Sequence, residues 1–195
     1  MSGSMAPSAR ARVSVVLALV TALTGLTACA ASAPAASAPA RITASDIAAM
    51  APVEVVDTLE ALPVDERPSD VTVSVRPDRL VITADGAETE RPLPEDLFYL
   101  SLAPYVDQTH DCFFHSLTTC LGELGGAALD VTVTDSSGVT LVDETVTAAD
   151  NGFVGLWLPR GIDATLEVAY DGARATTPIS TGAEDPTCLT GLHLS

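Results

Sequence analysis

The chain has 195 residues, of which 47% are hydrophobic and only 4% aromatic, and its formal net charge is −17. A surface this acidic repels the phosphates of nucleic acids, so nucleic acid is excluded from the expected partners. The same field attracts metal cations, but without specificity, and it identifies no site by itself.

An export signal occupies the start of the chain. Two arginines precede an apolar run, Val13 to Leu26, which is shorter than the roughly 20 apolar residues that span a bilayer. The run ends in Leu26-Thr27-Ala28-Cys29, which is similar to the bacterial lipobox, whose cysteine is acylated after cleavage. We therefore expect a lipoprotein signal peptide over residues 1–28 and attachment of Cys29 to the outer face of the cell membrane. A plain signal that is cleaved nearby is the alternative.

A tether follows the signal. Residues 30–40 contain only Ala, Ser and Pro, a composition that cannot build a core. We expect residues 29–41 to be flexible or partly extended.

Residues 42–95 are predicted to form a small unit of helices and a β-hairpin. Thr43-Ala-Ser-Asp46 has the form of a capping box, and apolar residues recur at helical spacing from Val53 to Leu62. Val71 to Val75 alternates with polar residues and Leu80 to Ala84 follows a turn, which predicts the hairpin. A unit this small needs to pack against the rest of the chain or against a second copy, so a homodimer is one expected partnership. Nothing in this unit indicates chemistry.

Residues 96–195 show β patterning throughout. Short apolar or alternating segments are separated by turn signals about every 8 to 12 residues. Strands are expected at residues 97–103, 129–134, 140–146, 153–158, 165–170 and 173–179. The sequence therefore predicts an α+β protein whose C-terminal part is an antiparallel β-sandwich. The run from Val-Thr-Val-Thr-Asp-Ser-Ser-Gly through Asp-Asn-Gly-Phe to Leu-Pro-Arg-Gly resembles the prealbumin-like sandwich of many binding modules. Trp157, the one tryptophan, is expected in the core.

The residues suited to chemistry gather in Thr109 to Cys120, with more near the C-terminus. This segment holds Cys112 and Cys120 together with His110 and His115, whereas Cys188 and His193 lie near the chain end. Apart from the signal cysteine the chain has three cysteines, and an odd number in an exported protein leaves one thiol free or paired with another chain.

Geometry constrains how Cys112 and Cys120 can cooperate. Their Cα atoms would lie about 12 Å apart on a straight helix and about 26 Å apart on a strand. A disulfide requires Cα atoms within about 7 Å, and a shared metal requires similar closeness. If the two cysteines act together, residues 113–119 must curl back on themselves.

Four kinds of site compete for these residues. Zinc motifs pair their ligands at short spacing, and only fragments of that pattern occur here. Cu(I) needs only two or three soft donors, which the three cysteines can supply from loops at one end of the sandwich. A blue-copper site is disfavoured because Met50 is the only methionine after the tether. A structural disulfide with a spare thiol is the fourth alternative. The residues alone favour neither this alternative nor metal or redox chemistry over the other.

Three segments carry a family resemblance. Cys112-Phe-Phe-His-Ser-Leu-Thr-Thr-Cys120, Asp150-Asn-Gly-Phe-Val-Gly-Leu-Trp-Leu-Pro159 and Asp185-Pro-Thr-Cys188 resemble the CueP family of extracytoplasmic copper-binding proteins. The resemblance runs from about residue 42 to the end of the chain. It implies an N-terminal α/β part, a C-terminal β domain and a role in copper tolerance of the cell envelope.

The resemblance also implies a ligand set. Cys112, Cys120 and Cys188 are the expected primary copper ligands, with His110 and His115 beside them. His193 is a weaker candidate, because its spacing from the last cysteine matches no motif. Family members in cells with two membranes are typically soluble in the periplasm, whereas this chain carries a lipobox.

The expected function is that of a membrane-anchored, extracytoplasmic protein that sequesters Cu(I) for copper tolerance or delivery. Stoichiometric reduction of Cu(II) by its thiols is a further expectation, but no enzymatic motif is present, neither a nucleophile elbow nor a Gly-rich phosphate loop. Besides copper and the bilayer, the expected partners are a thiol–disulfide oxidoreductase or a copper-enzyme client. The alternatives are a disulfide-stapled surface binding module without metal, and a thiol–disulfide protein, which the absence of a Cys-x-x-Cys motif disfavours.

Overall fold

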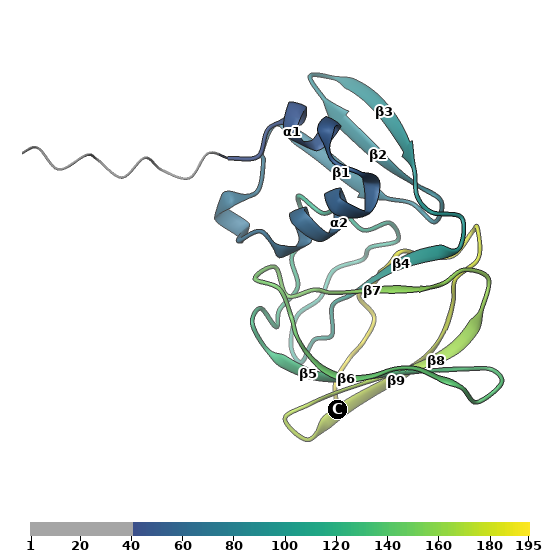
Figure 1. Ribbon diagram of the computed structural model, residues 1–195. Helices are drawn as coiled ribbons and strands as arrows, with labels where there is room; N and C mark the ends of the chain where they lie inside the picture. Colours follow the sequence, from purple (N-terminus) through teal and green to yellow (C-terminus); the bar gives the residue numbers. More distant parts are fainter. Residues whose placement is uncertain (1–40) are drawn as a thin grey trace, which may run out of the picture. The chain divides into compact units, whose positions relative to one another are not determined.

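The computed structural model describes residues 41–195 (Figure 1), so the predicted signal peptide, the lipidation site at Cys29 and most of the tether lie outside the described residues. The described part combines a few helices with three β-sheets, and the protein is α+β as predicted. Within residues 41–195, no helix is long and apolar enough to cross a membrane.

Short helices open the described chain. They are α1 (Ala44–Ala49), α2 (Pro52–Ala61) and a 3-10 turn, η1 (Val64–Glu66). The predicted capping box is confirmed at α1, where the Thr43 amide donates to Asp46 Oδ2 at 2.9 Å and the Asp46 amide donates to Thr43 Oγ1 at 3.3 Å. α2 begins on Pro52, which is tolerated in the first turn because its missing N–H would have no partner there. The buried face of α2 carries three aliphatic side chains and one carboxylate, that of Glu60.

An antiparallel sheet follows the helices. Its strands are β1 (Val71–Val75), β2 (Arg79–Ala84) and β3 (Ala87–Pro92), in the order β1-β2-β3. The hairpin of β1 and β2 was predicted, but β3 was not. Its sequence, Ala-Glu-Thr-Glu-Arg-Pro, is mostly exposed and shows no apolar alternation. It forms because Asp85 and Gly86 both take positive φ, at 51° and 75°, which closes a tight hairpin after β2.

Two further sheets face each other across a hydrophobic core. One contains β4 (Leu97–Leu102), β7 (Val154–Pro159) and β10 (Cys188–Leu189), in the order β10-β4-β7. The other contains β5 (Ala128–Asp135), β6 (Thr140–Thr147), β8 (Asp163–Tyr170) and β9 (Ala173–Ser180), in the order β6-β5-β8-β9. Figure 1 shows the two sheets as opposed layers, and alternate residues of β4, β5, β7 and β8 fill the space between them. The prealbumin-like connectivity stays a prediction.

The sandwich is not wholly antiparallel, which corrects the prediction. β10 pairs with β4 in parallel, with Cys188 opposite Ser101 and Leu189 opposite Leu102. β7 already occupies one edge of β4, so the returning C-terminal segment adds to the other edge. A strand of two residues carries no periodicity, and the sequence therefore gave no sign of it.

The N-terminal unit packs on the outer face of β4 and β7. Its core consists mainly of aliphatic side chains from α1, α2, β1 and β2, and it also includes Tyr99 and Leu117. Trp157 is only partly buried. Its ring lies 4.8 Å from that of Tyr99, and its Nε1 donates to Asp57 Oδ1 at 3.0 Å. The predicted core tryptophan therefore lies at the junction of α2 and the sandwich.

Candidate metal centre

The segment of residues 109–120, which contains two cysteines and two histidines, runs between β1 and β10. The Val75 amide donates to the His115 carbonyl at 2.8 Å, and the Leu117 amide donates to the Val73 carbonyl at 2.9 Å, so the segment lies along the edge of β1. On its other side, the amide of Cys188 donates to the Phe113 carbonyl at 3.1 Å. Main-chain hydrogen bonds from two sheets therefore hold this loop in place.

The loop curls between its two cysteines. The Cys120 amide donates to the Ser116 carbonyl at 3.1 Å, which closes one helical turn. As a result the Sγ atoms of Cys112 and Cys120 lie 3.7 Å apart, although the two cysteines are eight positions apart in the sequence. This is the bend that cooperation between the two cysteines requires.

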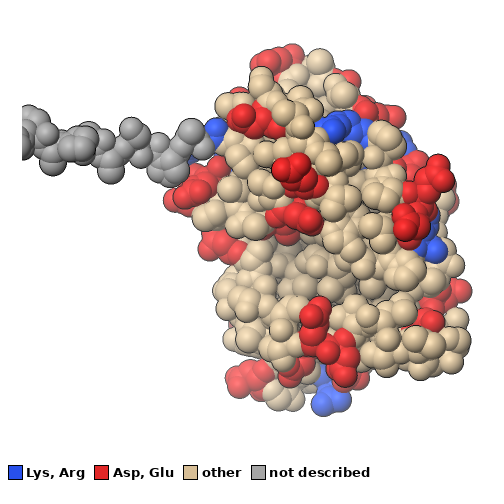
Figure 2. Space-filling model, in the orientation of Figure 1, with Lys and Arg blue, Asp and Glu red and all other residues tan. Residues whose placement is uncertain are grey.

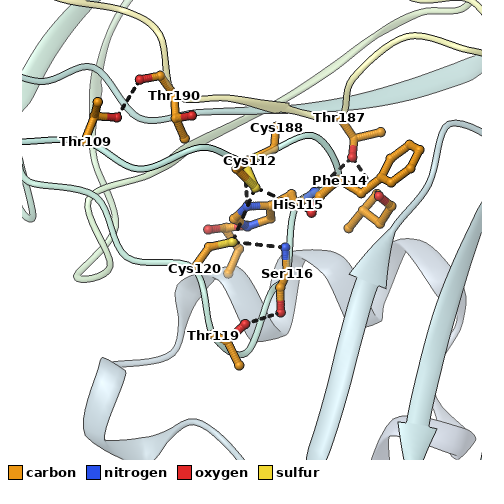
Figure 3. Close-up of a disulfide and its surroundings, with 12 residues drawn as sticks. Thr109, Cys112, Phe114, His115, Ser116, Thr119, Cys120, Thr187, Cys188 and Thr190 are labelled. Carbon is orange, nitrogen blue, oxygen red and sulfur yellow. Dashed lines mark hydrogen bonds and ion pairs between the residues drawn. A yellow bond between two sulfur atoms is a disulfide. The ribbon is translucent and has the colours of Figure 1, made fainter.

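The three sulfur atoms converge (Figure 3). Cys112 and Cys188 form a disulfide with a Cα–Cα distance of 5.6 Å, across 76 residues of chain. Cys120 is the free cysteine of the described residues, and it is partly buried. The disulfide fastens the loop to β10, and the free thiol lies beside it.

The two histidines of the segment approach the sulfurs from different surroundings. His115 is fully buried, and its Nδ1 lies 3.9 Å from Cys188 Sγ. His110 is exposed. Potential ligand atoms form two groups, and within each group these atoms lie within 4.8 Å of one another. One group is His110 with Cys112 and Cys120, and the other is His115 with Cys120 and Cys188. The two groups share Cys120, so one sulfur links an outer and an inner set of donors.

His193 does not reach the cluster. It is exposed and packs on Tyr105, with ring centroids 5.2 Å apart. The structure therefore brings together five of the six candidate metal ligands and leaves this histidine outside.

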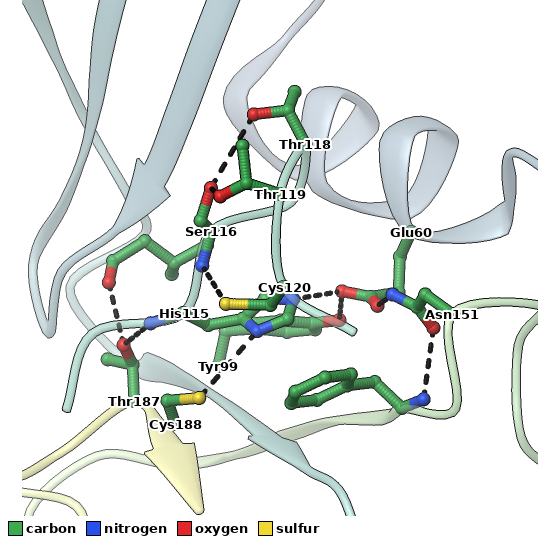
Figure 4. A network of polar contacts seen from close by, with 12 residues as sticks. Glu60, Tyr99, His115, Ser116, Thr118, Thr119, Cys120, Asn151, Thr187 and Cys188 are labelled. Carbon is green, nitrogen blue, oxygen red and sulfur yellow. Dashed lines mark hydrogen bonds and ion pairs between the residues drawn. The ribbon is translucent and has the colours of Figure 1, made fainter. Parts of the chain in front are cut away.

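Glu60 is a member of the centre that the sequence analysis missed (Figure 4). It lies on α2 and is only 8% exposed. Its carboxylate accepts hydrogen bonds from Tyr99 Oη at 2.9 Å and Asn151 Nδ2 at 2.6 Å, and His115 Nε2 lies 2.9 Å from Oε2. One signal was available: Glu60 comes four residues after Val56, on the face of the helix that the apolar residues define.

Arg67 also lies against the loop. It is 5% exposed, and its Nη1 donates to the carbonyl oxygen of Cys120 at 3.0 Å. Residues 42–95 were expected to carry no chemistry, yet they supply both Glu60 and Arg67 to the surroundings of the sulfurs.

Charge is favoured at three buried groups of the centre. Burial raises the pKa of Glu60, but hydrogen bonds from His115, Asn151 and Tyr99 outweigh it and hold the pKa below its ordinary value. Burial lowers the pKa of His115, and its hydrogen bonds with Cys120 and Glu60 reverse this and raise it. Burial raises the pKa of Cys120, yet the hydrogen bond and charge of His115 bring it below its ordinary range. The centre thus favours a thiolate, the form of cysteine that binds metals and attacks disulfides.

These donors fit a soft metal. Thiolate and imidazole groups select Cu(I), zinc or iron–sulfur clusters over hard cations, and Cu(I) accepts two or three such donors. The disulfide has to be reduced before Cys112 and Cys188 can bind metal as thiolates. Fold and site together define a class, an α+β protein with a sulfur and imidazole centre suited to a soft metal or to thiol redox chemistry.

Comparison with known proteins identifies the family. The model of the periplasmic copper-binding protein CueP matches residues 54–193, and the chain belongs to the CueP family. A crystal structure of S.CueP is similar, with 39% sequence identity and a TM-score of 0.72, over 76% of this chain and 91% of that one. A search of curated proteins found no match.

Proposed function

We propose that this protein sequesters Cu(I) outside the cytoplasm, with Cys112, Cys120 and Cys188 as ligands and His110 and His115 beside them. The observation that carries the proposal is the convergence of these donors into two groups that share Cys120, each within 4.8 Å. Four of these donors come from the segment 109–120 and Cys188 comes from β10, so the fold collects thiol and imidazole groups from two parts of the chain, the donor set that suits a soft metal.

The disulfide and the free thiol support a redox step during loading. Two thiols give one electron each to two Cu(II) ions, which yields two Cu(I) ions, one disulfide and two protons. A Cys112–Cys188 disulfide is what that reaction would leave on the protein, and it has to be reduced again before these two cysteines bind Cu(I) as thiolates. Cys120 keeps its thiol and stays available to hold Cu(I).

The two histidines have different roles in this proposal. His110 is exposed and receives copper from solvent at the outer group. His115 is buried and completes the inner group with Cys120 and Cys188. Groups of acidic side chains are scattered over the face in Figure 2, where they outnumber the basic ones, and they raise the local concentration of cations.

Acylation of Cys29 tethers the protein to the outer face of the membrane in this proposal. The anchor restricts delivery to partners at the membrane surface, either a copper enzyme or an oxidoreductase that reduces the disulfide. Replacing Cys29 with Ser releases the protein from the membrane fraction, and a Cys29→Ser chain that stays bound would overturn the anchoring.

Competition with a chromogenic Cu(I) chelator tests the copper site. The fully reduced wild type is expected to withdraw Cu(I) from the chelator, and Cys120→Ser, which removes the shared ligand, to withdraw far less. His193→Ala is the matched control and should behave as the wild type. Failure of the reduced wild type to withdraw copper would reject the proposal.

A further inference from the structure

Two buried side chains that border the cysteines contain polar atoms without a hydrogen-bond partner. Among the described residues, the buried side-chain nitrogen and oxygen atoms that make no hydrogen bond are Nε and Nη2 of Arg67 and Oγ of Ser101. Arg67 donates its remaining Nη1 to the carbonyl of Cys120, and Ser101 is paired with Cys188 in the sheet. Buried donors are almost always satisfied, so unpaired ones need an explanation.

Arg67 also has no carboxylate partner. It takes part in none of the salt bridges of residues 41–195. The nearby carboxylate of Glu60 is already held by His115, Tyr99 and Asn151. A buried cation without an anion beside it is strongly unfavourable. The protein therefore keeps a fixed positive charge against the Cys120 carbonyl. This charge forms no salt bridge, although the negative groups of Glu60, Cys120 and Asp150 lie near enough to act on it.

The positive charge of Arg67 would stabilise the negative charge that the sulfurs gain when the disulfide is reduced. Burial lowers the pKa of the Arg67 guanidinium, while the charges of Glu60 and Cys120 oppose that change, and an arginine stays protonated in proteins. Reduction of the disulfide turns two neutral sulfurs into thiols that can ionise. A Cu(I) ion bound by two thiolates leaves one negative charge in the centre, and by three thiolates leaves two.

We propose that Arg67 is the cation that balances the thiolates of this centre, and that it thereby favours the reduced, Cu(I)-binding state over the disulfide. This inference rests on the proposed copper function. As a cation Arg67 binds no metal, so it acts on the sulfurs through its charge. A purely structural role, that of fixing the Cys120 carbonyl, accounts for one nitrogen of the guanidinium and leaves the other two, Nε and Nη2, unexplained.

The test measures the equilibrium between disulfide and dithiol in the metal-free protein. In glutathione buffers, two glutathione thiols give two electrons and two protons to Cys112 and Cys188 and become one oxidised glutathione. The fraction of each form is counted by mass spectrometry after thiol trapping. Arg67→Gln removes the charge and keeps a donor for the Cys120 carbonyl, whereas Arg67→Lys keeps the charge.

Arg67→Gln is expected to shift this equilibrium about tenfold toward the disulfide, a potential about 30 mV more negative. Arg67→Lys should stay within about twofold of the wild type, because its charge is retained. Arg91→Gln is the matched control, since Arg91 also donates to main-chain carbonyls, but to those of Ile47 and Met50, away from the sulfurs. It should leave the equilibrium unchanged.

Two results would overturn the inference. One is a folded Arg67→Gln protein, judged by its melting curve, with the wild-type equilibrium. The other, which decides the matter if Arg67→Gln does not fold, is a shift in Arg67→Lys as large as about tenfold, because hydrogen bonding and not charge would then be what the site requires.

Chelator competition separates this inference from the proposed function. A reduced wild type that binds no Cu(I) rejects the copper function, and the glutathione equilibrium then decides the role of Arg67 alone. A wild type and an Arg67→Gln variant that bind Cu(I) equally well leave the copper function standing and contradict the charge balance.

Discussion

His115 is the residue through which the two halves of the described chain act on the sulfurs. Its Nε2 faces Glu60 at 2.9 Å, which orients the ring so that Nδ1 points toward Cys188. A carboxylate on one ring nitrogen fixes the orientation of a histidine and raises the basicity of the other nitrogen, a common arrangement behind metal-binding histidines. At the scale of single residues, Glu60 therefore sets the orientation of the His115 ring and the basicity of its Nδ1.

Replacing Glu60 tests this positioning. Glu60→Gln removes the charge that holds the ring, and we expect the Cu(I) affinity of the reduced protein to fall by about 10- to 100-fold, as for other groups behind a metal ligand. Chelator competition measures the change. Glu90→Gln is the control, because Glu90 lies exposed on β3 and forms an ion pair with Arg79 of the neighbouring strand β2. Equal affinities for the two variants would contradict a role for Glu60.

The reactivity of Cys120 should depend on pH in a predictable direction. Its pKa is lowered, with His115 as the main cause acting against burial, so its thiolate is present at a lower pH than that of an ordinary cysteine. In a Cys29→Ser chain with the disulfide intact, the alkylation rate of Cys120 should therefore rise at lower pH than that of a free thiol. His115→Ala should move this rise to higher pH, and an unchanged profile would show that His115 does not set the pKa.

At the scale of elements, the loop at residues 109–120 owes its shape to the strands beside it. It has no regular structure of its own beyond one turn, but β1 binds its backbone at His115 and Leu117. The disulfide then fastens Cys112 to β10, the short strand that the sequence did not predict. Two sheets and one covalent bond thus hold the donors.

Removing the disulfide should loosen this arrangement. The bond closes a long loop, with a sequence separation of 76 between the cysteines, and a disulfide of this kind stabilises a fold by about 2–4 kcal/mol. We expect Cys120→Ser/Cys188→Ser to unfold at a lower urea concentration than Cys120→Ser under oxidising conditions. The shared Cys120→Ser change prevents Cys112 from pairing with its other neighbour. Equal midpoints would mean that the disulfide does not stabilise the fold.

At the scale of the whole molecule, the centre lies between two hydrophobic cores. The core of the sandwich lies on one face of β4, and the second core, with α2 and Tyr99, lies on the other. A small third cluster, Ala103, Phe153 and Cys188, packs against Cys112 and Cys120. Donors come from the C-terminal part, while Glu60 and Arg67 come from the N-terminal part. Both parts are therefore needed for one centre.

A truncation tests this dependence. Residues 96–195 retain all five converging donors but lose Glu60 and Arg67 and expose Tyr99 and Leu117, which are 2% and 0% exposed in the full fold. We expect this fragment to aggregate or to lack cooperative thermal unfolding, as measured by circular dichroism. A folded fragment with the Cu(I) affinity of the full chain would show that the N-terminal unit is independent of the centre.

Local pattern predicted most elements and failed where pattern was absent. Most strands of the C-terminal sheets alternate polar and apolar residues, and β4 is a short apolar run, so pattern reading found these strands within one or two residues. β3 and β10 escaped, the first because it is mostly exposed and the second because it has two residues. The sequence analysis did not assign Glu60 and Arg67 to the centre, because charged side chains are normally solvated and a sequence does not show what packs over them.

The sequence by itself determined the helices, most strands and the set of sulfur and imidazole donors, because each depends on residues near one another in the chain. It also required that residues 113–119 curl if Cys112 and Cys120 were to meet. Only the tertiary structure decided that Cys112 pairs with Cys188 and leaves Cys120 free, and that His193 stays outside. Disulfide pairing and burial depend on distances between segments far apart in the chain, and those distances exist only once the sheets have packed.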